Sequence, residues 1–244
     1  MKHVFSFLLI ACCLTGFLHA QQTPVDSAQI VIDRYLGLLN FDEMKTDSML
    51  YIETIIVGRN HPNDTTVMKR WFVAPNQYRV EIWMRNALGY GLVTDGRNVF
   101  RKYNFKKEYW ENISASDYYD DAPAYDFHGP LYRWKTDGGN VEYQGEWNYN
   151  GHPAYRIFVQ SPIRYDRNYL FEKESGLLFL VHEFSTHAET MTEGPHVDWR
   201  AVHEYQPFGR CLFPSVESYQ YKEEIVFQYH TYKYLPINLE LFQK

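Results

Sequence analysis

The sequence has few cysteines. Only Cys12, Cys13 and Cys211 occur in 244 residues, and the first two lie in a segment that we interpret below as removable. The remaining chain would keep Cys211 alone, so it could form no intrachain disulfide. Because Cys211 precedes Leu212 and Phe213, we expect a buried thiol. Stability must then come from a packed core, which a chain of about 220 residues can build as one β domain.

Recognisable catalytic motifs are also lacking. The sequence contains no Gly-x-Ser-x-Gly nucleophile elbow, no P-loop, no dinucleotide-binding fingerprint and no His-Glu-x-x-His zinc motif. Neighbouring carboxylates such as Asp120 and Asp121 would point to opposite faces of a strand, so they do not form an acid–base pair. We therefore predict a protein that is not an enzyme and that needs no cofactor.

Positive charge is not concentrated anywhere along the chain. The 24 Lys and Arg residues face 30 Asp and Glu residues, for a net charge of −6, and no basic block occurs. Nucleic acid is therefore an unsuitable partner.

A group of histidines offers one metal-binding alternative. If residues near 191–192 form a hairpin turn, His187 and His196 lie across from each other and could bind zinc with a carboxylate. Histidines on exposed strands are usually solvated, however, and we predict no metal site. The complete group is His182, His187, His196 and His203, with Glu183, Glu189 and Asp198 nearby.

Beyond the first twenty residues, no apolar run approaches the length of a membrane-spanning helix. Residues 1–20 have a positive start at Lys2 and His3, an apolar stretch and a plausible cleavage site after Ala20, as in a signal peptide. We predict export to the periplasm of a Gram-negative-type envelope, with residues 21–244 as a single domain. An alternative is a lipobox at 9–12, which would lipidate Cys12.

Aromatic residues are abundant, at 18% of the chain, and they favour strands. Residues 23–40 show helical spacing, with a short helical turn expected at 42–45. Alternating patterns separated by turn residues then predict antiparallel strands of a mainly β fold with a few helices. The expected strands are 50–57, 66–73, 78–84, 90–94, 98–103, 141–147, 154–160, 167–172, 177–185, 197–205, 211–213, 216–222 and 225–234.

The segment 104–140 lacks this strand pattern. It is long, rich in aromatic residues and interrupted by Asp, Gly and Pro, and we expect short helices near 114–120 and 128–136. A loop of this length in a compact domain is usually functional, for example as a cover over a binding site, so we interpret it as a lid. The lid candidates are Trp110, Tyr118, Phe127 and Trp134.

Several short motifs, in order, resemble the LolA-like outer-membrane lipoprotein-sorting family. A helix ending near residue 40 leads into a long first strand. The later motifs are APNQYRVE at 74–81, TDGR at 94–97, NGHPAY at 150–155, FEKESGLL at 171–178, LFP at 212–214, YLPIN at 234–238 and LF at 241–242. The resemblance spans nearly all of the chain after residue 20.

The resemblance implies a curved half-barrel covered by the N-terminal helix and a lid. It further implies a non-enzymatic carrier whose partners are lipid acyl chains or lipidated protein. Envelope proteins are further candidate partners. Alternatively, the same fold could serve as an envelope structural or interaction protein without a ligand. Residues on alternate strand positions would form the cavity wall, or else plain core under the helix. These residues are Val80, Ile82, Met84, Val99, Tyr155, Ile157, Val159, Tyr169 and Phe171.

Overall fold

A computed structural model describes residues 24–121, 128, 130–136, 138–160, 166–184, 199–221 and 224–243. The predicted signal peptide, Cys12, the lid candidate Phe127, and His187 and His196 lie outside these ranges. Predictions about them remain predictions.

Thirteen strands lie within the described residues. Their bounds are β1 (Met49–Gly58), β2 (Thr65–Val73), β3 (Gln77–Met84), β4 (Ala87–Thr94), β5 (Phe100–Asn104), β6 (Tyr109–Asn112), β7 (Asn140–Tyr149), β8 (His152–Gln160), β9 (Asp166–Glu172), β10 (Leu178–Phe184), β11 (Trp199–Phe208), β12 (Cys211–Tyr221) and β13 (Glu224–Leu235).

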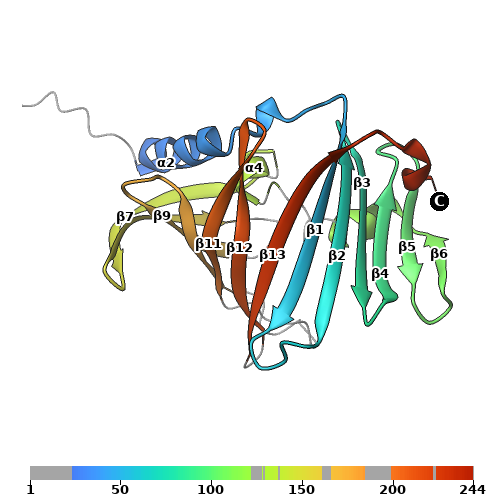
Figure 1. Ribbon diagram of the computed structural model, residues 1–244. Coiled ribbons are helices and arrows are strands. Elements are labelled where there is room, and N and C mark those ends of the chain that lie inside the picture. Colours follow the sequence, from blue (N-terminus) through green and yellow to red (C-terminus); the bar gives the residue numbers. More distant parts are fainter. Residues whose placement is uncertain are drawn as a thin grey trace, which may run out of the picture.

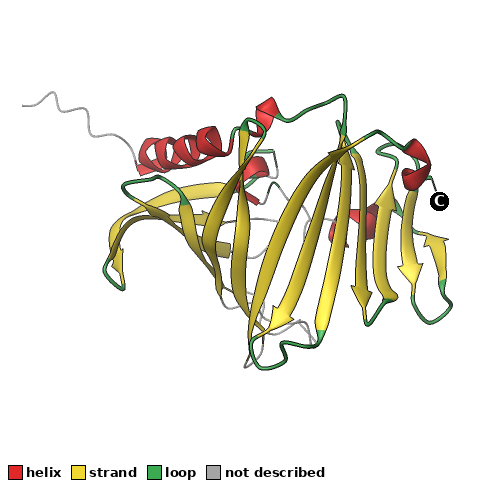
Figure 2. Cartoon of the chain, in the orientation of Figure 1, coloured by secondary structure: helices red, strands yellow, loops and turns green. Residues whose placement is uncertain are grey.

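All of these strands belong to one antiparallel sheet. Its order is β6-β5-β4-β3-β2-β1-β13-β12-β11-β10-β9-β8-β7, so two meanders meet where the first strand pairs with the last (Figure 1). β6 and β7 form the two edges, and the sheet is curved but not closed (Figure 2). The predicted fold class, a mainly β half-barrel with an N-terminal helix, is confirmed.

Helix α2 (Pro24–Leu39) covers one half of the concave side of the sheet. Its expected apolar stripe is buried, with Ala28, Ile32, Tyr35 and Leu39 packed against residues of β8, β9 and β12. The helix ends before Asn40, whose φ of 54° and ψ of 40° lie in the left-handed region that commonly follows a helix. A short 3-10 helix, η1 (Phe41–Glu43), replaces the turn expected at 42–45.

Tight turns join the strands where the sequence indicates them. At Asn150 and Gly151 both φ angles are positive, 50° and 89°, as a two-residue hairpin between twisted strands requires. At Asp95, Oδ1 accepts hydrogen bonds from the backbone N–H groups of Arg97, Asn98 and Val99. This side chain therefore satisfies the donors of the loop between β4 and β5.

Two predictions about strands were wrong. The segment 104–140 contains strand β6 as well as the short helices α3 (Ala115–Asp121) and α4 (Pro130–Arg133). Residues 211–221 form one strand, where two were expected at 211–213 and 216–222, because Pro214 sits beside a register shift between β11 and β12. Such irregular positions are where a strand tolerates the missing N–H of proline.

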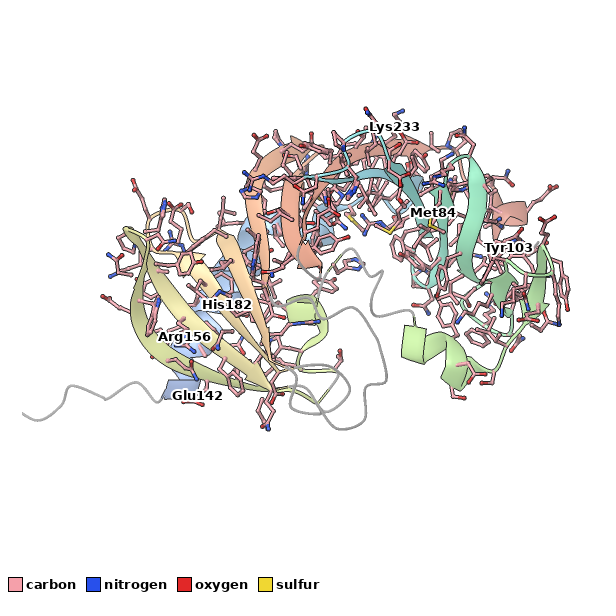
Figure 3. All side chains as sticks on the ribbon, turned by 90° about the horizontal axis from the view of Figure 1, so that it is seen from below. Met84, Tyr103, Glu142, Arg156, His182 and Lys233 are labelled. Atoms are coloured by element: carbon pink, nitrogen blue, oxygen red, sulfur yellow. The ribbon has the colours of Figure 1, made fainter. Side chains whose placement is uncertain are left out.

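The sheet has two faces that we name by their coverings. The inner face is the concave one, which carries Ile52, Arg70 and Val80 in cross-strand register and packs against α2, α3 and α4. The outer face carries Val73 and Val93, which pack against the C-terminal 3-10 helix η3 (Leu239–Phe242). Seen from below, the strands follow an arch with α3 on its concave side (Figure 3).

Candidate ligand-binding face

Most of the predicted cavity-wall residues lie deep in the inner face. Ile157, Val159, Tyr169 and Phe171 are buried in one cluster with the apolar stripe of α2. Val80 is buried in a second cluster with Tyr118 of α3. In the described structure these five residues pack under helices as core, and their contact with a ligand remains a prediction.

The other four predicted wall residues are more accessible. Ile82 and Tyr155 are half-buried on the inner face, and Met84, at the end of β3, keeps 50% of its surface exposed. Val99 lies in the turn before β5, where its N–H donates to Asp95. The accessible part of the predicted wall therefore begins around Ile82 and Met84.

The lid candidates do not all lie on the same face. Tyr118 is buried against the inner face, with its ring 5.2 Å from that of Phe100, and Trp134 packs against the α2 cluster. Trp110, by contrast, is part of β6 and packs with Val93 on the outer face, 4.7 Å from the Arg79 guanidinium. Trp110 therefore lies away from the face that a lid would cover.

A pocket of about 240 Å³ lies where η1, the β2–β3 turn and the start of α4 meet. Aromatic rings dominate it: His128 stacks on Tyr132 at 4.6 Å, and the Phe41 ring meets the His128 ring edge-on at 5.3 Å. The lining residues are Phe41, Asp42, Met44, Lys45, Thr46, Phe72, Ala74, Pro75, His128 and Tyr132. Phe72 lies on the inner face itself, and Phe41 is buried in the cluster beneath α2, so the pocket continues the inner face at its rim.

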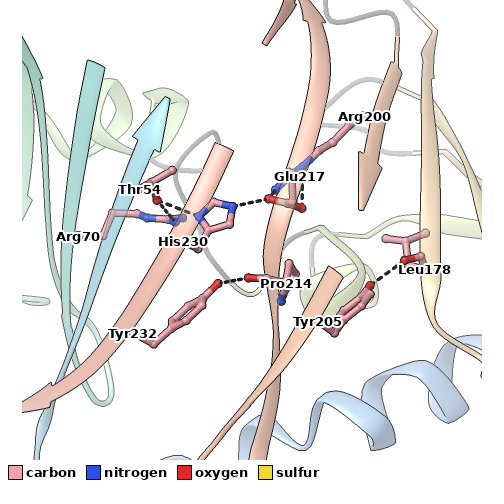
Figure 4. A network of polar contacts seen from close by, with 9 residues as sticks. All are labelled: Thr54, Arg70, Leu178, Arg200, Tyr205, Pro214, Glu217, His230 and Tyr232. Atoms are coloured by element: carbon pink, nitrogen blue, oxygen red, sulfur yellow. Dashed lines mark hydrogen bonds and ion pairs between the residues drawn. The ribbon is translucent and has the colours of Figure 1, made fainter. Parts of the chain in front are cut away.

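A chain of polar side chains crosses the middle of the inner face (Figure 4). Arg70 Nη2 donates to Thr54 Oγ1 at 3.1 Å, and Thr54 Oγ1 lies 2.9 Å from His230 Nδ1. On the other side of the ring, His230 Nε2 lies 2.9 Å from Glu217 Oε2. Arg200 donates to both Glu217 oxygens, at 3.1 and 2.5 Å. The five residues come from β2, β1, β13, β12 and β11.

The charges of this chain follow from its burial and its partners. Burial lowers the pKa of His230, although Glu217 opposes this shift, so the ring is neutral near pH 7. Burial by itself would raise the pKa of Glu217. Arg200 and His230 together have the larger and opposite effect, so the pKa falls to about 2. Glu217 is therefore a carboxylate that accepts the Nε2–H proton, and Thr54 donates its hydroxyl to Nδ1.

Two tyrosines lie beside the polar chain. The Tyr232 hydroxyl donates to the carbonyl of Pro214 at 2.6 Å, and the Tyr205 hydroxyl donates to the carbonyl of Leu178 at 2.8 Å (Figure 4). Burial raises the pKa of both hydroxyls, so they stay protonated. They tie β13 to β12 and β11 to β10 beneath the polar chain.

A hydroxyl, an imidazole and a carboxylate in a row invite comparison with nucleophilic catalysis. Thr54, however, is fully buried, and its hydroxyl already bonds to both Arg70 and His230. A substrate carbonyl cannot approach an oxygen enclosed in this way. The arrangement therefore orders charges within the inner face and does not present a nucleophile.

The described members of the histidine group lie apart from this chain. His203 Nε2 bonds to Ser218 Oγ at 2.7 Å, and the His182 ring lies 6.0 Å from that of Tyr149. Within the described ranges, no three His, Cys, Asp or Glu side chains are grouped closely enough to hold a metal ion. Over the same residues, no helix is long and apolar enough to cross a membrane.

Comparison with solved structures shows which known folds this architecture resembles. The chain is similar in structure to a DUF1329 family protein from Desulfovibrio piger, with a TM-score of 0.58 and 12% identity over 91% of this chain and 98% of that one. It is also similar to a LolA superfamily protein from Nitrosomonas europaea, with a TM-score of 0.57 and 9% identity over 89% and 97% of the two chains. The fold is LolA-like.

A third similar structure supports the LolA-like assignment. It is an outer membrane lipoprotein-sorting protein domain from Vibrio parahaemolyticus, with a TM-score of 0.55 and 11% identity over 88% of this chain and 97% of that one. No protein-family model matches the sequence, and no curated protein matches it. The resemblance inferred from the motifs is thus confirmed at the level of the LolA-like fold.

Proposed function

We propose that the protein is a non-enzymatic binder that carries lipid or lipidated protein in the cell envelope. The observation that carries this proposal is the inner face of the LolA-like sheet. Outside the polar chain it is apolar, and the short elements α3 and α4 cover part of it. Covers of seven and four residues bury little area, so a ligand of similar polarity can displace them at low cost. The likeness to a lipoprotein-sorting domain points the same way.

Hydrophobic burial alone can supply the affinity. Each acyl CH₂ group removed from water contributes about 0.8 kcal/mol, so a sixteen-carbon chain gains roughly 12 kcal/mol before ordering and association costs. No catalytic group or metal is needed for such binding. The half-buried Ile82 and Tyr155, the exposed Met84 and the rim pocket at Phe72 are the surfaces we assign to the ligand.

Carriage in the envelope requires export. We propose that residues 1–20 are cleaved and that residues 21–244 work as one domain in the periplasm. Envelope fractionation and the mass of the mature N-terminus test this directly. A mature chain that starts at an acylated Cys12, with processing sensitive to globomycin, would replace the free carrier with a tethered one.

Native mass spectrometry tests the carrier proposal itself. The protein, gently purified from envelope extracts, should carry lipid or lipidated protein. After ligand removal, the Ile82→Asn variant should bind an acyl probe more weakly than the wild type. Ile55→Asn is the matched control, because Ile55 is an exposed isoleucine on the outer face. Repeated recovery of an empty protein that binds no probe would reject the proposal.

One observation favours a second function. Five of the nine predicted wall residues are buried beneath α2 or α3, so much of the inner face is already filled. A protein whose inner face stayed filled would act through its surface, as an envelope interaction protein. Co-purification of a stable protein partner, together with the absence of bound lipid, would favour this alternative.

A further inference from the structure

Arg70 places a guanidinium in the middle of the apolar inner face. It pairs across strands with Ile52 on β1 and Val80 on β3, and Met68 and Phe72 flank it on the same face of β2. The side chain is only 8% exposed. An arginine in such surroundings normally needs a carboxylate partner, because burying an uncompensated charge is costly.

The contacts of Arg70 do not provide that partner. Its Nη2 group donates to the neutral hydroxyl of Thr54. Its Nε group is buried and has no hydrogen-bond acceptor among the described residues. Over the same part of the chain, no carboxylate lies within ion-pairing distance of this guanidinium.

The one carboxylate of the polar chain, Glu217, is already used. Both of its oxygens accept hydrogen bonds from Arg200, and Oε2 also receives the His230 Nε2–H. The neutral His230 ring and Thr54 separate Glu217 from Arg70 (Figure 4). The positive charge of Arg70 thus remains without a counter-charge from the described chain.

We propose that Arg70 binds the anionic oxygen group of an amphiphile, a carboxylate or a phosphate, whose hydrocarbon chain lies on the inner face. A guanidinium is suited to this role because its planar N–H donors match two oxygens of such a group. This inference rests on the proposed carrier function and adds the ligand class to it.

The surroundings of Arg70 select an amphiphile over a small hydrated anion. Met68, Ile56, Ile82 and Met84 follow one another on the inner face from Arg70 toward the end of β3. The four residue steps along β2 from Arg70 to Thr66 span about 13 Å, which offers an apolar path for a hydrocarbon chain. A free anion would lose its hydration at Arg70 and gain no apolar contact in return.

Competition with a fluorescent acyl probe tests the inference. Dodecanoate and dodecyl phosphate should bind the wild-type full-length protein about tenfold or more tightly than dodecanol, as expected for charged hydrogen bonds. Arg70→Gln should abolish this difference by weakening only the two anions. Arg85→Gln removes the same charge from an exposed surface pair and should leave all three affinities unchanged.

The outcomes separate this inference from the carrier proposal. If the wild type binds dodecanol as tightly as dodecanoate, the anion site is wrong and the carrier function stands. If dodecanoate, dodecyl phosphate and dodecanol all fail to bind, both the anion site and the carrier function are wrong. Inorganic phosphate that binds as well as dodecyl phosphate would show an anion site without an amphiphile and overturn the inference. The wild-type comparison needs no variant, so it holds even if Arg70→Gln does not fold.

Discussion

His230 donates its Nε2–H to the carboxylate of Glu217 across 2.9 Å, in the middle of the inner face. This bond couples a neutral imidazole to a buried anion. The other ring nitrogen of His230, Nδ1, accepts a hydrogen bond from the Thr54 hydroxyl, and that hydroxyl in turn accepts one from Arg70. Stability should therefore respond to any change in the charge of this chain.

Glu217→Gln should be strongly destabilising. The substitution keeps the shape of the side chain but removes the charge that balances Arg200. Breaking a buried ion pair costs roughly 3–5 kcal/mol, and because Arg200 is partly exposed we expect about 3 kcal/mol from urea unfolding. Glu43→Gln, which breaks the exposed pair with Arg210, should cost about 1 kcal/mol or less. Equal losses in the two variants would contradict the central role of Glu217.

Stability should fall as the pH drops below 6.5. The folded-state pKa of His230 lies below its ordinary value of 6.5, so the unfolded state binds the proton first and gains stability as acid is added. Glu217 adds to this trend, because its pKa is near 2 in the folded state against 4.5 ordinarily. The contribution of Glu217 is full above pH 4.5 and is lost as the pH falls toward 2.

Urea unfolding at several pH values between 7.5 and 3.5 measures these two contributions. A His230→Gln variant should lose the pH dependence that begins as the pH falls below 6.5 and should keep the part below 4.5 that belongs to Glu217. A wild-type stability that is constant down to pH 5 would contradict the neutral state assigned to His230.

The packing of α2 can be tested with two isoleucines of the same helix. Ile32 is fully buried in the main cluster, whereas Ile30 is 52% exposed. Ile32→Ala should reduce the free energy of unfolding by about 2–4 kcal/mol, through lost transfer energy and a residual cavity. Ile30→Ala should change it by about 0.5 kcal/mol or less. Similar values for both would show that α2 does not hold the sheet.

The Asp95 turn should depend on a single oxygen. Asp95→Ala leaves three backbone N–H groups without their acceptor, and we expect a loss of about 1–2 kcal/mol. Asp95→Asn retains an amide oxygen at the same place and should recover much of that loss. Thermal unfolding of the two variants in parallel gives the comparison.

Tyr118 should compete with a ligand for the inner face. Tyr118→Ala removes a ring that is buried in one inner-face cluster with Val80 and Leu92, so an acyl probe should bind to this variant more tightly than to the wild type. Tyr109 is an exposed tyrosine of the nearby strand β6. Tyr109→Ala is therefore the matched control and should not affect probe binding. Weaker binding to Tyr118→Ala would instead make Tyr118 part of the ligand site.

Much of the fold could be predicted from local patterns. Some sequence patterns depend only on the geometry of neighbouring residues, and these predicted their elements. They are the apolar stripe of α2, the alternation of β3, and the turns at Asp95-Gly96 and Asn150-Gly151. Strand β6 was missed because its hairpin turns through Glu108 at a φ of 58°, a conformation that glutamate rarely adopts. Without that turn, Trp110 could not be placed in a strand or assigned to the outer face.

The polar chain could not be found in the same way. Thr54, Arg70, Arg200, Glu217 and His230 share no local spacing, and only the pairing of five strands brings them together. One signal was present: Arg70 interrupts the apolar alternation of Met68 and Phe72 on the strand predicted at 66–73. A charge at such a position indicates either a partner far away in the sequence or a functional site.

The pairing of β1 with β13 also constrains how the chain folds. Met49 lies opposite Leu235 in this pair, so nearly the whole polypeptide separates two neighbouring strands. Contacts of such long range form late, because the intervening loop must first be closed at an entropic cost. The polar chain crosses this same junction from Thr54 to His230, so its hydrogen bonds are completed only after the last strand has been synthesised.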